Sequence, residues 1–166
     1  MRDTPVRAYI GLGANLADPV EQLRQALLRI AAIEGVRLLR ASRLYRSPPM
    51  GPPNQPDYCN AACAVDSRLA PRALLRELQA IEDALGRRRE AMRWAPRMLD
   101  LDLLHVEGVS AADSDLILPH PGIAKRNFVL VPLAEVAPEL DIPGLGPIAA
   151  RAREIGAEDL SIWAEA

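Results

Sequence analysis

Two aspartates separated by a single residue, Asp100 and Asp102, carry the sharpest chemical signal in the sequence. They lie in the apolar run 98–106, which predicts a strand, and residues two apart in a strand project to the same face. Their Cα atoms would be about 6.6 Å apart, so that the two carboxylates could bracket a pair of hard cations about 3.5–4 Å apart. Three leucines would anchor the opposite face of the strand in the core: Leu99, Leu101 and Leu103. Taken alone, the pair fits a metal site and an ion pair with nearby Arg97 equally well.

A cluster of arginines immediately precedes this strand. Residues 87–97 contain five arginines, opposed only by Glu90, in a chain whose net charge is −2. Arginine forks bind phosphate groups bidentately, and Mg²⁺ takes one or two carboxylates and completes its shell with phosphate oxygens and water. The arginines and the aspartates together therefore predict a magnesium–nucleotide site suited to phosphoryl transfer.

Three further polar or aromatic residues each allow two interpretations. Trp94 could stack on a flat ring or anchor its loop on the core, and Asn60 could pin the preceding proline-rich loop or read the polar edge of a heterocycle. His120, between Pro119 and Pro121, is by itself more typical of a hydrogen-bonded loop histidine than of a catalytic group.

Two other motifs favour structural roles. The run 11–16 lacks the third glycine of a dinucleotide-binding fingerprint and the Lys-Ser/Thr of a phosphate loop, so it predicts a tight strand-to-helix turn. Cys59 and Cys63 would lie about 13 Å apart along a strand, too far to share a metal ion, and they are interpreted as small buried side chains.

The periodicity of apolar residues predicts four strands and two helices. The strands are expected at 7–13, 36–46, 58–66 and 98–106. One helix would start at the cap formed by Asp18, Pro19 and Glu21 and end at Gly35, and another would run from Pro71 to Gly86. Residues 119–140 contain a helix and a strand in an order that the pattern does not determine. The sequence β-α-β-β-α-β predicts a ferredoxin-like α+β sandwich with a mainly antiparallel sheet and C-terminal additions.

Length and composition restrict the class of protein. The 166 residues, 49% of them hydrophobic, suit one domain spanning 1–166. No apolar stretch approaches the roughly 18 residues of a membrane span, and the N-terminus does not predict a signal peptide. The acidic balance argues against a nucleic-acid or anionic-membrane binder. We expect a cytoplasmic monomer that binds small molecules.

Several blocks of the sequence resemble, in order, one family of enzymes. Residues 93–104 resemble the signature of the 6-hydroxymethyl-7,8-dihydropterin pyrophosphokinases of folate biosynthesis. Residues 45–52 and 55–62 resemble the substrate loop of that family, and residues 9–16 resemble its opening strand and turn. Residues 119–121 and 126–133 resemble its last block.

The resemblance implies transfer of the β,γ-diphosphate of ATP to the hydroxymethyl group of the pterin, with release of AMP. Asp100 and Asp102 would hold two Mg²⁺ ions, and Arg87 and Arg97 would be the catalytic arginines. The residues implied for the pterin are Ser47, Pro48, Met50, Tyr58, Asn60, Trp94 and Phe128. The residues implied for the nucleotide are Gln79, Glu82, Arg89, Leu103, His120 and Arg126. The chain departs from the family pattern at Ala14, Glu90, Ala95 and Pro121.

Two other functions use the same residues. A ferredoxin-like sensing module would bind a phosphorylated effector through the arginines without any reaction. A metal-dependent phosphodiesterase would use Asp100 and Asp102, but it would lack the additional ligands of such sites, because His105 is expected on the opposite face of the strand.

Overall fold

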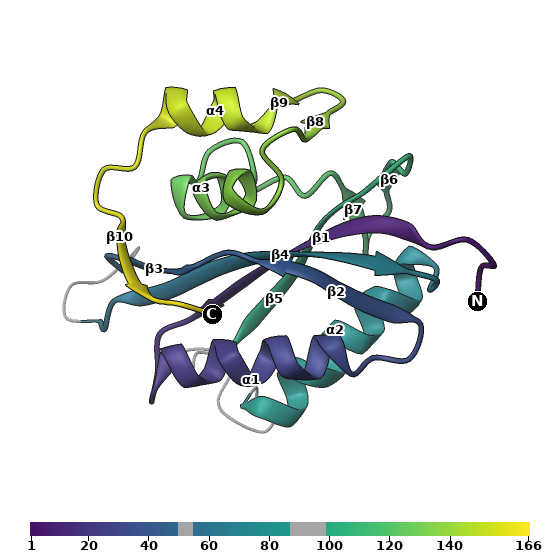
Figure 1. Cartoon of the computed structure of the whole chain (residues 1–166), viewed down its shortest axis with the longest axis horizontal. Helices are drawn as coiled ribbons and strands as arrows, with labels where there is room; N and C mark the ends of the chain where they lie inside the picture. The colour runs from purple at the N-terminus through teal and green to yellow at the C-terminus, as the bar shows by residue number, and fades with distance from the viewer. Residues whose placement is uncertain (50–54, 87–98) are drawn as a thin grey trace.

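An antiparallel sheet runs through the molecule with helices on both of its faces (Figure 1). The computed structural model describes residues 1–49, 55–86 and 99–166. The elements follow one another in the order β1 (Val6–Ala14), α1 (Pro19–Ala31), β2 (Val36–Ala41), β3 (Leu44–Ser47), β4 (Tyr58–Ser67), α2 (Pro71–Leu85), β5 (Asp100–Val106), β6 (Ala111–Ala112), β7 (Ile117–Leu118), α3 (Asn127–Val136), β8 (Asp141–Ile142), β9 (Gly146–Pro147), α4 (Ile148–Ile155) and β10 (Ser161–Ala164).

The order of strands in the sheet is that of the predicted ferredoxin-like core. The path is β10-β3-β4-β1-β5, with β2 also paired to β4, and each pairing is antiparallel. The predicted α+β class is therefore confirmed. The C-terminal additions supply β10 at one edge of the sheet and the helices α3 and α4 on its second face (Figure 1).

The prediction of one continuous strand over residues 36–46 is wrong, because the chain breaks there into β2 and β3. Ser42 causes the break: its backbone N–H donates to the Ala62 carbonyl at 2.8 Å, and its hydroxyl accepts from the Ala62 N–H at 2.9 Å. The side chain thus replaces a ladder bond, and the register against β4 is displaced by one residue between Ala41 and Tyr45.

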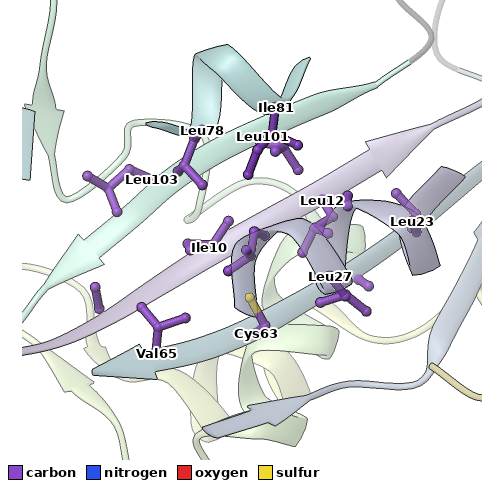
Figure 2. Packing of buried hydrophobic residues seen from close by; sticks show 14 of the residues in the cluster. Ile10, Leu12, Leu23, Leu27, Cys63, Val65, Leu78, Ile81, Leu101 and Leu103 are labelled. Atoms are coloured by element: carbon purple, nitrogen blue, oxygen red, sulfur yellow. The ribbon is translucent and has the colours of Figure 1, made fainter. Parts of the chain in front are cut away.

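Helices α1 and α2 cover one face of the sheet and enclose the main core (Figure 2). As predicted, Asp18 caps α1, with its carboxylate accepting from the Glu21 N–H at 3.2 Å, and Gly86 ends α2. Helix α1 ends at Ala31, so the end expected at Gly35 is wrong. Cys59 and Cys63 are confirmed as buried side chains without a disulfide, and burial raises the pKa of each thiol to about 12.

Helices α3 and α4 cover the other face. Residues 127–136, which the periodicity left unassigned, form α3 although Pro132 lies inside the helix. A second buried cluster joins α3 to the sheet through Tyr9, Ala62 and Leu104. Residues on this face of β1, β4 and β5 therefore point toward α3, and those on the other face point toward α1 and α2.

Candidate active site

The aspartates of β5 project onto the α3 face of the sheet, beside a strand that carries glycines. Asp100 pairs with Gly13 of β1, and Asp102 pairs with Gly11. Leu99, Leu101 and Leu103 are buried in the main core on the opposite side, as predicted. Directly opposed residues of neighbouring strands share a face, so each carboxylate stands next to a position without a side chain.

Gly11 and Gly13 lie within β1, as the strand expected at 7–13 requires, so the turn expected over 11–16 is wrong for residues 11–14. The chain turns only after Ala14, ahead of α1. A Cβ atom at Gly13 would come within 3.2 Å of the Asn60 Oδ1 atom, because Gly13 also pairs with Asn60 of β4. Gly13 thus separates Asn60 from Asp100 across three strands, a distance of about 10 Å at the usual strand spacing. A glycine in the middle of a strand is a signal of such a close approach, and it could have been recognised in the sequence.

A cavity of about 300 Å³ opens over these glycines, at the lower end of the usual range for a small-molecule site. We call it the Asn60 cavity. Five of the residues that the resemblance implies for the pterin line it: Ser47, Pro48, Tyr58, Asn60 and Phe128. Gly11, Gly13, Asp100, Asp102 and Arg126 also line it. Residues from β1, β3, β4, β5 and the start of α3 are thus brought to one place.

Asn60 is buried, and its side-chain amide donates to the Ser47 hydroxyl at 2.7 Å. This bond joins β3 to β4 at the point where both strands reach the cavity. Asn60 therefore pins the end of β3 through a side chain, and its Oδ1 atom lies near the floor formed by Gly13.

A second cavity, of about 250 Å³, lies on the other side of Asp102. We call it the His120 cavity. Three residues implied for the nucleotide line it, Gln79, Leu103 and His120, together with the hairpin residues 114–117. Asp102 lines both cavities and is thus the residue at which they meet.

His120 is oriented by its own loop. The Gly122 N–H donates to the His120 Nδ1 atom at 2.9 Å, so the proton of the neutral ring is on Nε2. That Nε2 atom is 3.8 Å from the Asp102 Oδ1 atom. The ring therefore presents a donor at the boundary between the two cavities.

Two residues implied for the nucleotide lie elsewhere. Arg126 lines the Asn60 cavity, and its guanidinium carbon is 5.9 Å from the centre of the Phe128 ring. Glu82 is buried, with 4% of its surface exposed, and its carboxylate accepts from the Leu101 N–H at 2.8 Å. Glu82 thus holds the backbone between Asp100 and Asp102.

The remaining predicted site residues are outside the described part of the chain. They are Met50, Arg87, Arg89, Trp94 and Arg97.

A family of known proteins matches most of this chain. Residues 9–138 match the family described as 7,8-dihydro-6-hydroxymethylpterin-pyrophosphokinase (HPPK). The chain belongs to the HPPK family.

Two bacterial relatives illustrate the similarity. Both are named 2-amino-4-hydroxy-6-hydroxymethyldihydropteridine pyrophosphokinase. The protein from Methylorubrum extorquens is 48% identical over 83% of this chain and 87% of its own length. The protein from Haemophilus influenzae is 44% identical over 83% of this chain and 86% of its own length.

Solved structures share the fold at low sequence identity. The wild-type HPPK-DHPS structure from Plasmodium falciparum is 12% identical, covers 95% of this chain and has a TM-score of 0.74. An HPPK-DHPS structure in complex with substrates covers 96% of this chain with a TM-score of 0.72. The chain spans about half the length of these structures, 48% and 46% respectively.

The structure also contains a larger cavity, of about 630 Å³, at the other end of the sheet. Its described lining includes Tyr9 and His105 but none of the predicted site residues, so its size alone does not make it the active site.

The prediction that His105 faces away from the aspartates is wrong. An extra residue, Leu104, interrupts the pairing of β5 with β1 and returns His105 to the α3 face, where its ring stacks on Tyr9. Burial lowers the pKa of His105, which favours its neutral form.

Glu135, which was not predicted as a functional or structural residue, attaches α3 to β3. The Tyr45 hydroxyl donates to this carboxylate, and so does the Arg43 N–H at 2.6 Å. Burial opposes ionisation of Glu135, but the hydrogen bonds from Tyr45 and Arg43 outweigh it and hold its pKa below the usual value. Burial and the bond to Glu135 raise the pKa of Tyr45 to about 12. Sequence spacing carries no sign of this contact, because about 90 residues separate the partners.

Proposed function

We propose that this chain transfers the β,γ-diphosphate of ATP to the hydroxymethyl group of 6-hydroxymethyl-7,8-dihydropterin. The hydroxyl oxygen of the pterin would form a bond to the β-phosphorus, the bridging oxygen would leave with AMP, and the hydroxyl proton would be released. Membership of the HPPK family and the names of its relatives support this reaction. The observation that carries the proposal is the position of Asp102, which lines both cavities and so stands between the two expected substrates.

The Asn60 cavity is the proposed pterin site. A planar ring with a polar edge needs an apolar surface to stack on and a fixed hydrogen-bonding group to read the edge. Phe128 supplies the aromatic surface in the first turn of α3, and the amide of Asn60 supplies the polar group on the sheet. Gly11 and Gly13 line this cavity, so that the ring would lie against the backbone of β1.

The chemistry of the aspartates fits magnesium that arrives with a nucleotide. In the described part of the chain, no group of three or more His, Cys, Asp or Glu side chains is placed to enclose a metal ion. Mg²⁺ does not need such a cage, because one or two carboxylates suffice when phosphate oxygens and water complete the shell. We therefore assign Asp100 and Asp102 as the residues that would hold two Mg²⁺ ions. When bound, the ions would neutralise charge on the phosphate oxygens during transfer.

The His120 cavity is the proposed nucleotide site. His120 would donate from Nε2 to a phosphate oxygen, since its Nδ1 atom is already occupied by the Gly122 N–H. The guanidinium of Arg126 extends toward this side: a Cβ atom at Gly122 would meet Arg126 Nη1 and His120 Nδ1 at 3.1 Å each. Arg126 and His120 together would hold phosphate groups above the boundary marked by Asp102. Gln79 and Leu103 would complete the cavity wall.

Five residues keep the roles that the resemblance implies for them. Arg87 and Arg97 would support the transferring group, Arg89 would contact the nucleotide, and Trp94 and Met50 would complete the pterin site. Guanidinium groups suit these tasks because they bind phosphate in a fixed fork geometry.

A nucleotide product assay tests the proposal. The protein is incubated with ATP and Mg²⁺, with and without 6-hydroxymethyl-7,8-dihydropterin and with and without EDTA. We expect AMP only when both the pterin and the metal are present. Formation of ADP instead would indicate an ordinary kinase. Binding of both ligands without turnover would favour a sensing module, and both results would refute the proposed reaction.

A further inference from the structure

The C-terminal strand β10 lies directly behind the residues that form the proposed pterin site. It pairs with β3, with Ser161 opposite Arg46 and Ile162 opposite Tyr45, and the pairing is interrupted around Trp163 (Figure 1). A hydrogen bond from Arg24 of α1 to the Glu165 carbonyl, 2.9 Å long, holds the end of this strand. The strand lies beyond residues 9–138, the part of the chain that matches the HPPK family.

Trp163 holds the guanidinium of Arg46. The Arg46 Cζ atom is 3.8 Å from the centre of the indole ring, a cation–π contact, and the partly buried ring packs against the main core. Arg46 also faces Asp57 of the segment that leads into β4, with Nη1 3.7 Å from Oδ2. The contact with the ring removes much of the freedom of this long side chain and so favours the ion pair with Asp57.

The Arg46–Asp57 ion pair lies one residue away from the Asn60 cavity along both segments of the chain. Arg46 precedes Ser47, Asp57 precedes Tyr58, and Ser47 and Tyr58 are opposite each other in the β3–β4 pairing. Ser47 and Tyr58 line the Asn60 cavity, and Ser47 accepts the hydrogen bond from Asn60. Since Arg46 alternates with Tyr45 and Ser47, it lies on the opposite face of β3 and, among the described residues, is linked to the site through the backbone.

We propose that Trp163 and Arg46 are positioning residues for the pterin: the C-terminal strand, acting through the Trp163–Arg46–Asp57 contacts, sets the separation of Ser47 and Tyr58 at the cavity. This inference rests on the proposed function. The C-terminal strand would thus contribute to binding of the pterin and not to binding of ATP, because the His120 cavity is formed by different elements.

Steady-state kinetics of Trp163→Ala test the proposal. We expect the KM for the pterin to rise about three- to fivefold, in the range of a lost cation–π contact, with the KM for ATP unchanged. Trp163→Phe, which keeps an aromatic face, should restore most of the pterin affinity. Ile162→Ala is the matched control on the same strand, since Ile162 is 52% exposed, and it should behave as the wild type.

A double-mutant cycle separates positioning from a general loss of stability. If Trp163 acts through Arg46, then Trp163→Ala should add little to the effect of Arg46→Ala on the pterin KM. The proposal is overturned if Trp163→Ala leaves the pterin KM unchanged, raises both KM values together, or keeps its full effect in the Arg46→Ala background.

A direct binding measurement distinguishes failure of this inference from failure of the proposed function. Calorimetric titration of the pterin, with Mg²⁺ and a non-hydrolysable ATP analogue present, gives its Kd for the wild type and for Trp163→Ala. If the wild type forms no AMP but binds the pterin, the proposed reaction fails while the ratio of Kd values still decides the role of Trp163. If the wild type does not bind the pterin, both are refuted.

Discussion

The buried carboxylate of Glu82 offers a sharp test of how the aspartates are held in place. β5 is the last strand of the sheet, so one edge of its backbone has no neighbouring strand among the described residues. Leu101, between the two aspartates, directs its N–H to that edge, and Glu82 accepts it at 2.8 Å. Removing the carboxylate should therefore weaken both the strand and the geometry of Asp100 and Asp102.

The expected magnitude follows from the type of bond. A hydrogen bond to a charged acceptor contributes about 1.5–3 kcal/mol, and an unsatisfied buried N–H costs a similar amount. We expect Glu82→Ala to lower the free energy of unfolding by about 2–3 kcal/mol, which lowers the Tm of a protein of this size by roughly 4–12 °C. Glu82→Gln keeps an oxygen acceptor and should lose only about 1 kcal/mol.

Urea unfolding followed by circular dichroism measures the stability, and AMP formation measures the activity at a temperature where all variants are folded. Both should fall in the order wild type, Glu82→Gln, Glu82→Ala. Glu77→Ala, an exposed glutamate on the same helix, is the control and should change neither. The reasoning is refuted if Glu82→Ala is as stable as Glu82→Gln, or if it is destabilised with no loss of kcat.

Four further predictions concern the metal site, the cavity floor and buried titratable groups. Asp102→Asn should reduce AMP formation by more than about a hundredfold and leave the circular dichroism spectrum unchanged. EDTA should abolish AMP formation by the wild type. A wild-type rate in the variant would exclude Asp102 as a metal ligand. Gly13→Ala should raise the KM for the pterin about fivefold, because the new Cβ would displace the Asn60 amide. Gly11→Ala should have a smaller effect, because its new Cβ would meet the flexible Leu104 side chain. The reverse order of effects would contradict the assignment of Gly13 to the floor of the Asn60 cavity. Glu135→Gln should lower the free energy of unfolding near pH 7. Because folding lowers the pKa of Glu135, the carboxylate stabilises the folded protein above the usual pKa of 4.5, and this stabilisation disappears as the pH falls through the folded pKa. Unfolding curves of the variant and of the wild type should therefore converge in acid. Neither Cys59 nor Cys63 should react with a thiol reagent in the native protein at pH 8, while both should react in urea. Rapid labelling of the native protein would contradict the burial of the two thiols.

Local periodicity was enough to predict the strand that carries the aspartates and the two helices that cover its apolar face. The alternation around Asp100 and Asp102 placed both carboxylates on one face of a strand and the leucines on the other, and the structure agrees. The caps at Asp18 and Gly86 correctly marked the start of α1 and the end of α2, because capping depends on neighbours within one turn. The resemblance added the family, which the comparisons confirm.

The predictions that failed depended on how distant strands pair. The division of 36–46 follows from the bonds between Ser42 and Ala62, and the return of His105 to the α3 face follows from the extra residue at Leu104. A shift of one residue in register reverses the face of every side chain beyond it, and no local pattern records the register.

The sequence by itself determined which residues are available for chemistry and, where no bulge interrupts the strand as it does at Leu104, which of them share a face of their own element. Only the tertiary structure decided that Gly13 lies between Asn60 and Asp100, and that Asp102 lies where two cavities meet. The physical reason is that side-chain direction within an element is set by a fixed backbone period, whereas contacts between elements depend on pairing and packing across the whole chain.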